Sequence, residues 1–308
     1  MRVTVFTPTY NRAHTLAPLY HSLCEQTFLD FEWLIVDDGS TDDTESLIAG
    51  WLTDHNGFSI RYYKQPNGGK HTAINRGVSL ANGELFFIVD SDDRLPPDAL
   101  EQIDAVENTI KNKSGFAGVC GVKGYFDGRT VGASFDGQIL DITTSEREKY
   151  GVTGDKAEVF YTDILREYPF PVIKGEKFMT EAVVWDRIAH DGYKLRFFNE
   201  IVYLCEYRDD GLTARYDELY DKYPIGYALF YGQRINFGLI SGSNAVDIYK
   251  QFYDRLNGRY SLREIAGFLQ TTPADLYYAT HILNSSKPAK KMAARVIQKL
   301  SGGNKYDS

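Results

Sequence analysis

The chain has 308 residues and a formal net charge of −8, with 43% hydrophobic and 25% charged residues. This composition supports a buried core and excludes an intrinsically disordered chain. The acidic balance argues against general nucleic-acid binding, which depends on a basic face. A chain of this length is expected to form one main domain with an appended piece.

The three cysteines, Cys24, Cys120 and Cys205, lie far apart, with no Cys-x-x-Cys pair and no nearby histidine to complete a zinc site. They favour a reducing cytoplasm. The N-terminus stops being apolar too early for a signal peptide, and no later run approaches the roughly 20 apolar residues of a membrane span. We therefore expect a cytoplasmic protein. Its basic tail, residues 287–305, predicts either a solvated helix or a peripheral contact with the inner face of a membrane.

Four short apolar runs in the first hundred residues each end in a small polar cluster. They are residues 3–6, 33–36, 60–63 and 85–89. Amphipathic segments separate them, and this βαβα rhythm predicts a largely parallel sheet with helices on both faces. Ligands of such sheets bind beyond the carboxyl ends of the strands, which is where the polar clusters lie.

Further elements are expected along the chain. Ser40 or Thr41 is expected to cap the second helix, and Pro96 and Pro97 to open another. After Thr213 the composition shifts to Tyr-rich helical stretches, so we predict a domain boundary there. The remaining expectations are β-structure over 116–142, helices around 158–167 and 181–190, and strands at 195–198 and 201–207.

Two familiar nucleotide-binding signatures are absent. Residues 67–71 (Asn-Gly-Gly-Lys-His) form no P-loop, because Lys64 stands in place of the first glycine and His71 in place of Ser or Thr. The glycines at positions 118, 121 and 124 lack the spacing of the dinucleotide fingerprint. P-loop and dinucleotide binding are therefore excluded.

An acidic cluster, residues 90–93 (Asp-Ser-Asp-Asp), follows the fourth apolar run. Carboxylates this close repel one another unless a cation or hydrogen-bond donors compensate, so we favour a divalent ion with a diphosphate over a capping turn. Tyr10 offers a flat face for a base, and Asp38 can accept a hydrogen bond from a base N–H. Taken singly, however, Tyr10 is better explained by packing and Asp38 by turn chemistry.

The combination of motifs resembles the family 2 glycosyltransferases of the GT-A fold. The motifs are residues 7–12 (Thr-Pro-Thr-Tyr-Asn-Arg), 36–44, 82–84 and 89–93, in this order. The resemblance implies an α/β fold with a Rossmann-like, mostly parallel sheet flanked by helices and a C-terminal helical appendage. The predicted domains are a GT-A domain at 1–213, divided into a nucleotide-sugar half at 1–95 and an acceptor half at 96–213, and a helical region at 214–308.

The resemblance also implies an activity, that of a metal-dependent inverting glycosyltransferase. Such an enzyme would use Mn²⁺ or Mg²⁺ and move a sugar from a nucleoside-diphosphate donor, with UDP favoured, to a glycan or lipid-linked acceptor in surface polysaccharide synthesis. One alternative is a nucleotidyltransferase that makes nucleotide sugars, although its glycine-rich phosphate loop is missing here. Another is a non-catalytic nucleotide- or glycan-binding module. The sugar, the acceptor and the oligomeric state are not readable from the sequence.

The resemblance assigns donor binding to residues at the strand ends. Tyr10 would stack on the base and Asp38 would bind its imide edge, with Pro8 and Arg12 nearby; Asp92 would contact the ribose or a metal-bound water, Asp93 the metal, and Asp90 would support the turn. The arginine that many relatives carry before Asn75 is replaced by Ile74. Lys70 or His71 is expected to contact the diphosphate in its place, with a solvent-exposed helix start as the alternative.

Inversion requires a base that takes the proton of the acceptor hydroxyl. The family uses a carboxylate in an element at the start of a helix, and residues 177–185 align with it. Glu181 then takes the base position and Glu176 is the reserve candidate, while the alternative for Glu181 is a first-turn acid favoured by the helix dipole. Asp209 and Asp210, in a glycine-containing loop, are expected in a lid over the diphosphate.

Overall fold

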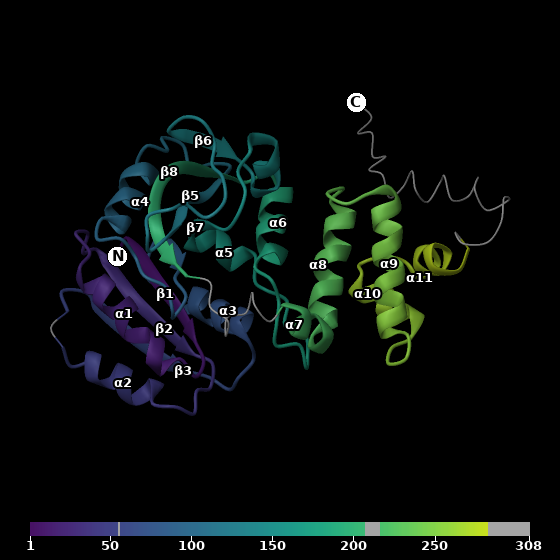
Figure 1. The fold of residues 1–308 in the computed structure, drawn as a ribbon, viewed down its shortest axis with the longest axis horizontal. Helices are drawn as coiled ribbons and strands as arrows, with labels where there is room; N and C mark the ends of the chain where they lie inside the picture. Colours follow the sequence, from purple (N-terminus) through teal and green to yellow (C-terminus); the bar gives the residue numbers. More distant parts are fainter. Residues whose placement is uncertain (55, 207–215, 283–308) are drawn as a thin grey trace. The chain divides into compact units, whose positions relative to one another are not determined.

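A computed structural model describes residues 1–54, 56–206 and 216–282. Their contacts divide the chain into two compact units, whose elements are labelled in Figure 1. Among the described residues, the first unit consists of Met1–Val172 and residues 184–206. The second consists of Ile173–Val183 and residues 216–282. The boundary at Thr213 lies outside the described residues and stays a prediction.

The first four strands are parallel neighbours, as the βαβα rhythm predicts. They are β1 (Val3–Thr9), β2 (Phe31–Asp37), β3 (Ser59–Lys64) and β4 (Leu85–Ile88), connected by α1 (Ala13–Cys24), α2 (Thr44–Trp51) and α3 (Lys70–Leu80). Strand β1 pairs with both β2 and β4, and β2 pairs with β3. All three pairings are parallel, so the largely parallel α/β fold is confirmed for this half of the sheet.

Four later strands extend the same sheet. They are β5 (Phe116–Tyr125), β6 (Ile139–Ile142), β7 (Lys156–Tyr161) and β8 (Lys194–Cys205), and the order across the eight-stranded sheet is β3-β2-β1-β4-β7-β5-β8-β6. Strand β7 runs antiparallel to β4 and β5, whereas β5 and β8 are parallel. The helices of this half are α4 (Ala99–Glu107), α5 (Thr162–Glu167), α6 (Ala182–His190) and a 3-10 helix at Thr144–Tyr150.

Four local predictions were wrong. Residues 158–161 belong to β7 rather than to a helix, because pairing with β4 and β5 overrides the local pattern. A single strand, β8, replaces the two expected between residues 195 and 207. Helix α4 begins at Ala99, after the two prolines rather than at them. The Ser40 hydroxyl accepts a hydrogen bond from the Asn11 amide at 2.8 Å instead of capping α2.

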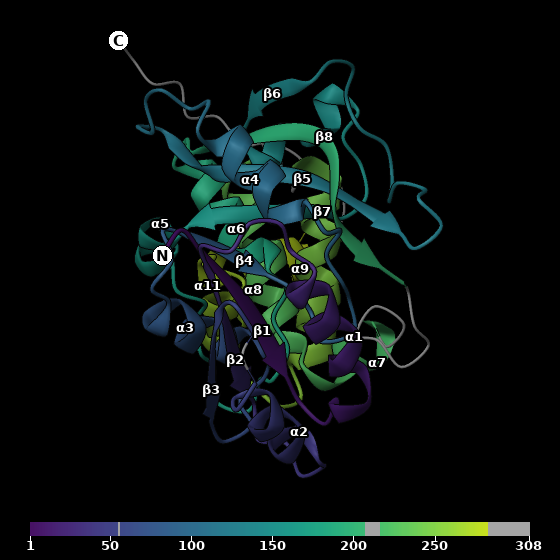
Figure 2. The same ribbon diagram turned by 90° about the vertical axis from the view of Figure 1, so that its left-hand side faces the viewer.

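The core of the first unit lies on both faces of the sheet. Figure 2 shows α1 and α3 on opposite sides of β1. Leu16 and Leu19 of α1 are fully buried in the cluster that includes Trp33 of β2. On the α3 side, Gly77 meets the ring of Phe6, and any Cβ there would overlap that ring. A glycine is therefore required for α3 to approach β1 this closely.

The second unit is helical, which confirms the predicted helical C-terminal region. Its helices are α7 (Tyr216–Lys222), α8 (Pro224–Asn236), α9 (Gly242–Leu256), α10 (Leu262–Phe268) and α11 (Pro273–Tyr277), followed by a π-helical turn at Tyr278–Ile282. Tyr249, Phe252 and Leu256 of α9 are fully buried in its core. None of the helices in the described ranges has the length and apolar character that a bilayer crossing requires. The basic tail lies outside these ranges.

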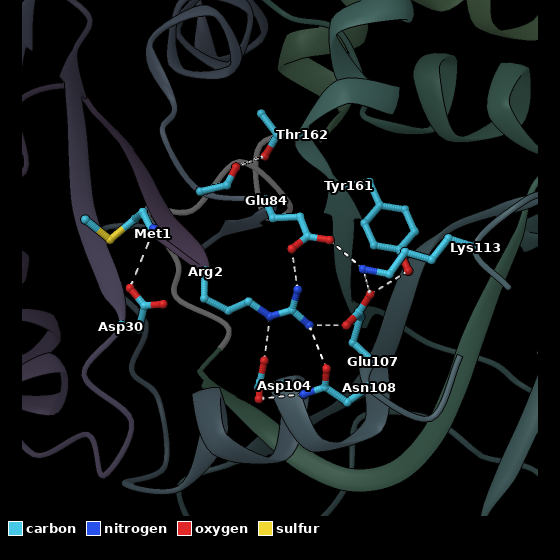
Figure 3. A network of polar contacts seen from close by, with 11 residues as sticks. Met1, Arg2, Asp30, Glu84, Asp104, Glu107, Asn108, Lys113, Tyr161 and Thr162 are labelled. Carbon is cyan, nitrogen blue, oxygen red and sulfur yellow. Dashed lines mark hydrogen bonds and ion pairs between the residues drawn. The ribbon is translucent and has the colours of Figure 1, made fainter. Parts of the chain in front are cut away.

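A network of charges joins the residues just before β1 and β4 to helix α4 (Figure 3). Arg2 donates to Asp104 and Glu84 at 2.5 Å each and also pairs with Glu107. Lys113 pairs with Glu84 at 2.5 Å and with Glu107 at 2.7 Å. The Glu107 carboxylate is fully buried, so these cations compensate its desolvation. Burial by itself raises the pKa values of Glu84 and Glu107, but Lys113 and Arg2 lower them by more.

The substitution Arg2→Met is expected to lower the free energy of unfolding at pH 7 by about 3 kcal/mol, because it removes one partner of a buried charge network. Carboxylates with a lowered folded pKa stabilise the protein above their unfolded pKa, about 4.3 for Glu, and this contribution is lost as the pH falls through the folded value. The variant should therefore lose less stability on acidification than the wild type. Urea unfolding at pH 7, 5, 4 and 3 measures both effects.

The matched control is Arg129→Met, which removes an exposed guanidinium paired with Asp127. This variant should keep the wild-type midpoint and acid dependence. Equal midpoints for the two variants would contradict a stabilising role of the Arg2 network.

Candidate functional site

Three adjacent strand ends form one edge of the sheet. In the order β2, β1, β4 they lead into Asp37 and Asp38, into Tyr10, and into the acidic loop 90–93. The strand order reverses at β1, since β2 follows on one side and β4 on the other. Such a reversal opens the crevice in which α/β sheets bind their ligands. The polar clusters identified in the sequence therefore share one edge.

Two of the sequence motifs are joined by hydrogen bonds. The Asn11 side-chain oxygen accepts from the Thr41 amide at 2.8 Å, and the Asp42 carboxylate accepts from the Ala13 amide at 3.0 Å. Asn11 has a φ of 53°, a left-handed conformation that Asn tolerates. These contacts tie the loop after β1 to the loop after β2. Between them the Tyr10 ring remains 48% exposed, whereas Pro8 is buried within β1.

The Asp38 carboxylate is buried and accepts four hydrogen bonds. Its Oδ1 accepts from Gly68 N at 2.9 Å and from Gln65 Nε2 at 2.8 Å, and its Oδ2 accepts from Gly69 N at 2.7 Å and from Asn67 Nδ2 at 3.1 Å. A carboxylate has about four lone-pair positions, so all of them are in use. Asp38 therefore holds the loop that leads from β3 into α3. A base N–H can reach this carboxylate only by displacing one of the two side-chain amides.

Lys70 and His71, at the start of α3, have different surroundings. Lys70 Nζ lies 2.7 Å from Asp90 Oδ1, so this ammonium reaches the acidic loop. The His71 side chain is 1% exposed and neither ring nitrogen has a hydrogen-bond partner. Burial lowers the pKa of His71, against the opposite effect of the Asp38 charge, and this favours a neutral imidazole. Of the two, Lys70 has the charge and position for an anionic ligand.

The acidic loop is held by β8, far along the chain. The Tyr203 hydroxyl donates to Asp93 Oδ2 at 2.5 Å and accepts from the Asp90 amide at 3.0 Å. Arg94 forms an antiparallel bridge with Leu204, with hydrogen bonds of 3.0 and 2.8 Å. Strand β8 thus orients this loop through one side chain and one backbone bridge.

Charged groups of both signs lie close to this loop. Burial, with the Asp90 charge close by, raises the pKa of Asp93 to about 7. Burial lowers the pKa of the Lys123 ammonium on β5, but Asp90, Glu158 and Asp93 raise it by more. The Lys123 Nζ lies 4.2 Å from the centre of the Tyr203 ring. Arg12 lies 3.6 Å from Asp92. The loop therefore has cations on several sides.

Tyr203 and Lys123 were missed by the sequence reasoning. Both lie in strands, and Tyr203 is 110 positions from Asp93. The available signals were the Tyr203 hydroxyl within the apolar run 201–205 and the Lys123 charge within the mostly apolar strand β5. A buried tyrosine hydroxyl or ammonium needs a partner, so each was a sign of a polar neighbour in the fold.

The residues at this edge suit a divalent ion in part. Asp92 and Asp93 offer carboxylate oxygens, the ligands that Mg²⁺ and Mn²⁺ prefer. Within residues 1–54, 56–206 and 216–282, no group of three or more His, Cys, Asp or Glu side chains is arranged to hold a metal. One or two carboxylates are sufficient when phosphate oxygens complete the coordination. The donor set therefore fits an ion bound together with a diphosphate.

The two candidate bases lie in the second unit. Glu181 immediately precedes α6 and is partly exposed. Glu176 is buried, and its carboxylate accepts from the Gly226 amide at 3.0 Å at the start of α8. Glu176 thus supplies an acceptor to the first turn of a helix. The predicted lid residues Asp209 and Asp210 lie outside the described residues.

Comparison with known proteins matches one protein family to the N-terminal part of the chain. The sequence profile described as "Glycosyl transferase family 2" matches residues 4–147, which include the strand ends that carry Tyr10, Asp38 and the acidic loop. Residues 4–147, a little under half of the chain, are therefore similar to glycosyl transferase family 2, and we call them the family 2 segment. Tyr203 lies outside this segment.

Curated relatives share this family 2 segment. The chain is 39% identical over 99 residues to the chondroitin synthase of Pasteurella multocida, covering 32% of this chain and 10% of that protein. It is 34% identical over 102 residues to the glycosyltransferase GlyG of Streptococcus pneumoniae serotype 4, covering 33% of each. The chain therefore spans between a tenth and a third of the length of these two relatives.

Solved structures resemble a larger part of the chain. The structure of S. aureus TarS 1-349 in complex with UDP matches with a TM-score of 0.59 at 18% identity, covering 100% of this chain and 93% of that one. The mannosyltransferase PcManGT from Pyrobaculum calidifontis, in complex with GDP-Man and Mn²⁺, matches with a TM-score of 0.51 at 22% identity, covering 96% and 79%. At these identities the likeness establishes the fold, which is GT-A.

The substitution Asp38→Asn is expected to lower the free energy of unfolding by about 2 kcal/mol. Both oxygens of the buried wild-type carboxylate accept from N–H donors, and in the variant an NH₂ group would face two of these donors. Thermal unfolding followed by circular dichroism measures the effect. The control is Asp43→Asn, five residues along in an exposed position, which should leave the midpoint unchanged. Equal midpoints for the two variants would show that the Asp38 hydrogen bonds add no stability.

Proposed function

We propose that this protein is a metal-dependent inverting glycosyltransferase that moves a sugar from a nucleoside-diphosphate donor, with UDP favoured, to a glycan or lipid-linked acceptor. The observation that carries the proposal is the single edge where β1, β2 and β4 bring Tyr10, Asp38 and the acidic loop 90–93 together in the family 2 segment. The proposed setting is surface polysaccharide synthesis at the cytoplasmic face of a membrane.

The nucleoside is proposed to bind between the loops after β1 and β2. The exposed Tyr10 ring offers a stacking surface for the base, and Arg12 lies two residues further along the same loop. Asp38 is proposed to have two roles. Its carboxylate holds the Gly68 and Gly69 amides, and contact with the base imide requires the Gln65 or Asn67 amide to move aside.

The diphosphate is proposed to lie between Lys70 and the acidic loop. The Lys70 ammonium, now 2.7 Å from Asp90, takes the place of the family arginine that Ile74 replaces. A diphosphate would share this cation with Asp90. His71 is less suited to the role because its imidazole is buried and its pKa is lowered.

Asp93 and Asp92 are proposed to hold Mn²⁺ or Mg²⁺ together with the diphosphate oxygens. When bound, the ion neutralises the charge that grows on the diphosphate as the glycosidic bond breaks. The protein's own part is orientation, since the Tyr203 hydroxyl holds Asp93 Oδ2 and the bridge at Arg94 holds the loop. Fixed carboxylates bind an ion without the cost of reorganising during the reaction.

Glu181 is proposed as the base that takes the proton of the acceptor hydroxyl during attack on the anomeric carbon. It is partly exposed and directly precedes α6, which favours a carboxylate there through the helix dipole. The reserve candidate Glu176 is buried and occupied by the first turn of α8. Glu181 is therefore the better placed of the two to meet a substrate.

Calorimetric titration tests the donor site. One of UDP, dTDP, GDP and CMP is expected to bind. Mn²⁺ should tighten this binding by at least about tenfold, because Asp92 and Asp93 would hold the ion together with the diphosphate oxygens. The variant Asp93→Ala should lose the effect of Mn²⁺, whereas Asp98→Ala, an exposed position just before α4, should retain it. A wild-type nucleotide Kd that is the same with and without Mn²⁺ would overturn the metal-dependent donor site.

The substitution Glu181→Gln tests turnover. Release of UDP from its sugar donor is expected to fall by at least about 100-fold while donor affinity stays within about twofold, because only proton transfer is removed. A coupled assay for UDP and a calorimetric titration measure the two quantities. Wild-type turnover in Glu181→Gln would remove the base assignment and leave Glu176 to be tested. A non-catalytic module would show no release in either protein.

A further inference from the structure

The segment Ile173–Val183, which carries Glu181, belongs by its contacts to the helical second unit. It has no regular secondary structure before α6 begins at Ala182. A segment of this kind needs contacts from elsewhere to keep one conformation, because fixing each backbone residue costs about 1–2 kcal/mol of entropy. Three contacts that hold it come from one helix, α8.

Three points of the segment are attached to α8. The Glu176 carboxylate accepts from the Gly226 amide at 3.0 Å. The Phe178 ring stacks on Tyr227, with centroids 5.4 Å apart and planes inclined by 24°. The side-chain Nε2 of Gln233 donates to the carbonyl oxygen of Val183 at 3.0 Å. Glu181 lies between the second and third points.

The spacing on α8 explains how one helix reaches both ends of the segment. Residues 226 and 233 are seven apart, or about two helical turns, so they share one face. A Cβ at Gly226 would lie 2.6 Å from the Phe178 carbonyl oxygen. The backbone of the segment therefore rests directly on this face, and glycine is needed at position 226.

Gln233 is an unusual residue for its position. It is 2% exposed, in a helix whose other buried residues are mainly apolar. A buried amide costs free energy unless it is hydrogen-bonded, and an apolar residue of the same size would avoid that cost. Its hydrogen bond to Val183 lies two residues beyond Glu181. This hydrogen bond offsets the cost and ties α8 to the backbone near Glu181.

We propose that α8 holds the backbone on both sides of Glu181, which makes Gln233 and Glu176 positioning residues for the base. The inference rests on the proposed function of Glu181. Helix α8 then contributes to turnover by keeping the backbone around Glu181 in one conformation. A base held by a loose segment would sample geometries from which proton transfer does not occur, and misplacement by about 1 Å can cost about 100-fold in rate.

The test is Gln233→Leu, which keeps the size of the side chain and removes the donor to Val183. The matched control is Asn236→Leu on the same helix, which removes a hydrogen bond of 2.9 Å to the Gln270 carbonyl oxygen, away from the segment. In Gln233→Leu, kcat for UDP release from its sugar donor should fall by about tenfold to 100-fold, with donor Kd within about twofold. The control should keep both values.

Hydrogen exchange gives a readout that does not depend on activity. The amides of residues 177–182 should exchange at least about fivefold faster in Gln233→Leu than in the wild type and in Asn236→Leu. If Gln233→Leu does not fold, Phe178→Leu, which removes the ring stack on Tyr227, takes its place. The same pattern is expected from it.

The outcomes separate this inference from the proposed function. Full turnover in Glu181→Gln overturns the base assignment and this inference with it. Loss of turnover in Glu181→Gln, together with unchanged kcat or unchanged exchange in Gln233→Leu, overturns the positioning role alone. A loss of donor affinity in Gln233→Leu equal to its loss of kcat would mean general damage and also contradicts the proposal.

Discussion

The buried Asp38 carboxylate is the interaction on which the arrangement of the candidate donor site depends. Its four hydrogen bonds join the end of β2 to the loop between β3 and α3. A buried carboxylate without donors is costly, so the loop must present its amides inward. That conformation places the first residue of α3, Lys70, within reach of Asp90 after β4. One carboxylate thus helps to place a cation that pairs with an acid two strands away in the sheet.

The acidic loop depends in turn on the distant half of the sheet. Tyr203 of β8 bonds both Asp93 and the Asp90 amide, and the bridge between Arg94 and Leu204 fixes the next residues. The family 2 match ends at residue 147, so Tyr203 and Leu204 lie outside the region that carries the family pattern. The recognisable motif and the strand that orients it are separate parts of the chain. The geometry of the loop is consequently a property of the whole sheet.

The second unit has a comparable division of roles. Its aromatic and aliphatic core is ordinary helical packing, but α8 also carries a glycine and a buried amide that serve the segment 173–183. Glu176 and Glu181 are alike in the sequence, five positions apart. In the structure Glu176 is buried at the start of α8, whereas Glu181 is partly exposed before α6. This difference in surroundings, and not residue type, separates an anchoring role from a proposed chemical one.

The sequence by itself determined the parallel strands, the connecting helices and the edge where polar residues gather. These features follow from the periodicity of apolar residues and from residue types at strand ends, which are local properties. Only the tertiary structure decided that residues 158–161 form a strand, that His71 is buried while Lys70 meets Asp90, that Asp38 is saturated, and that Tyr203 and Gln233 orient other groups. Each depends on which residues far apart in the chain become neighbours, and a buried polar group takes its role from those neighbours.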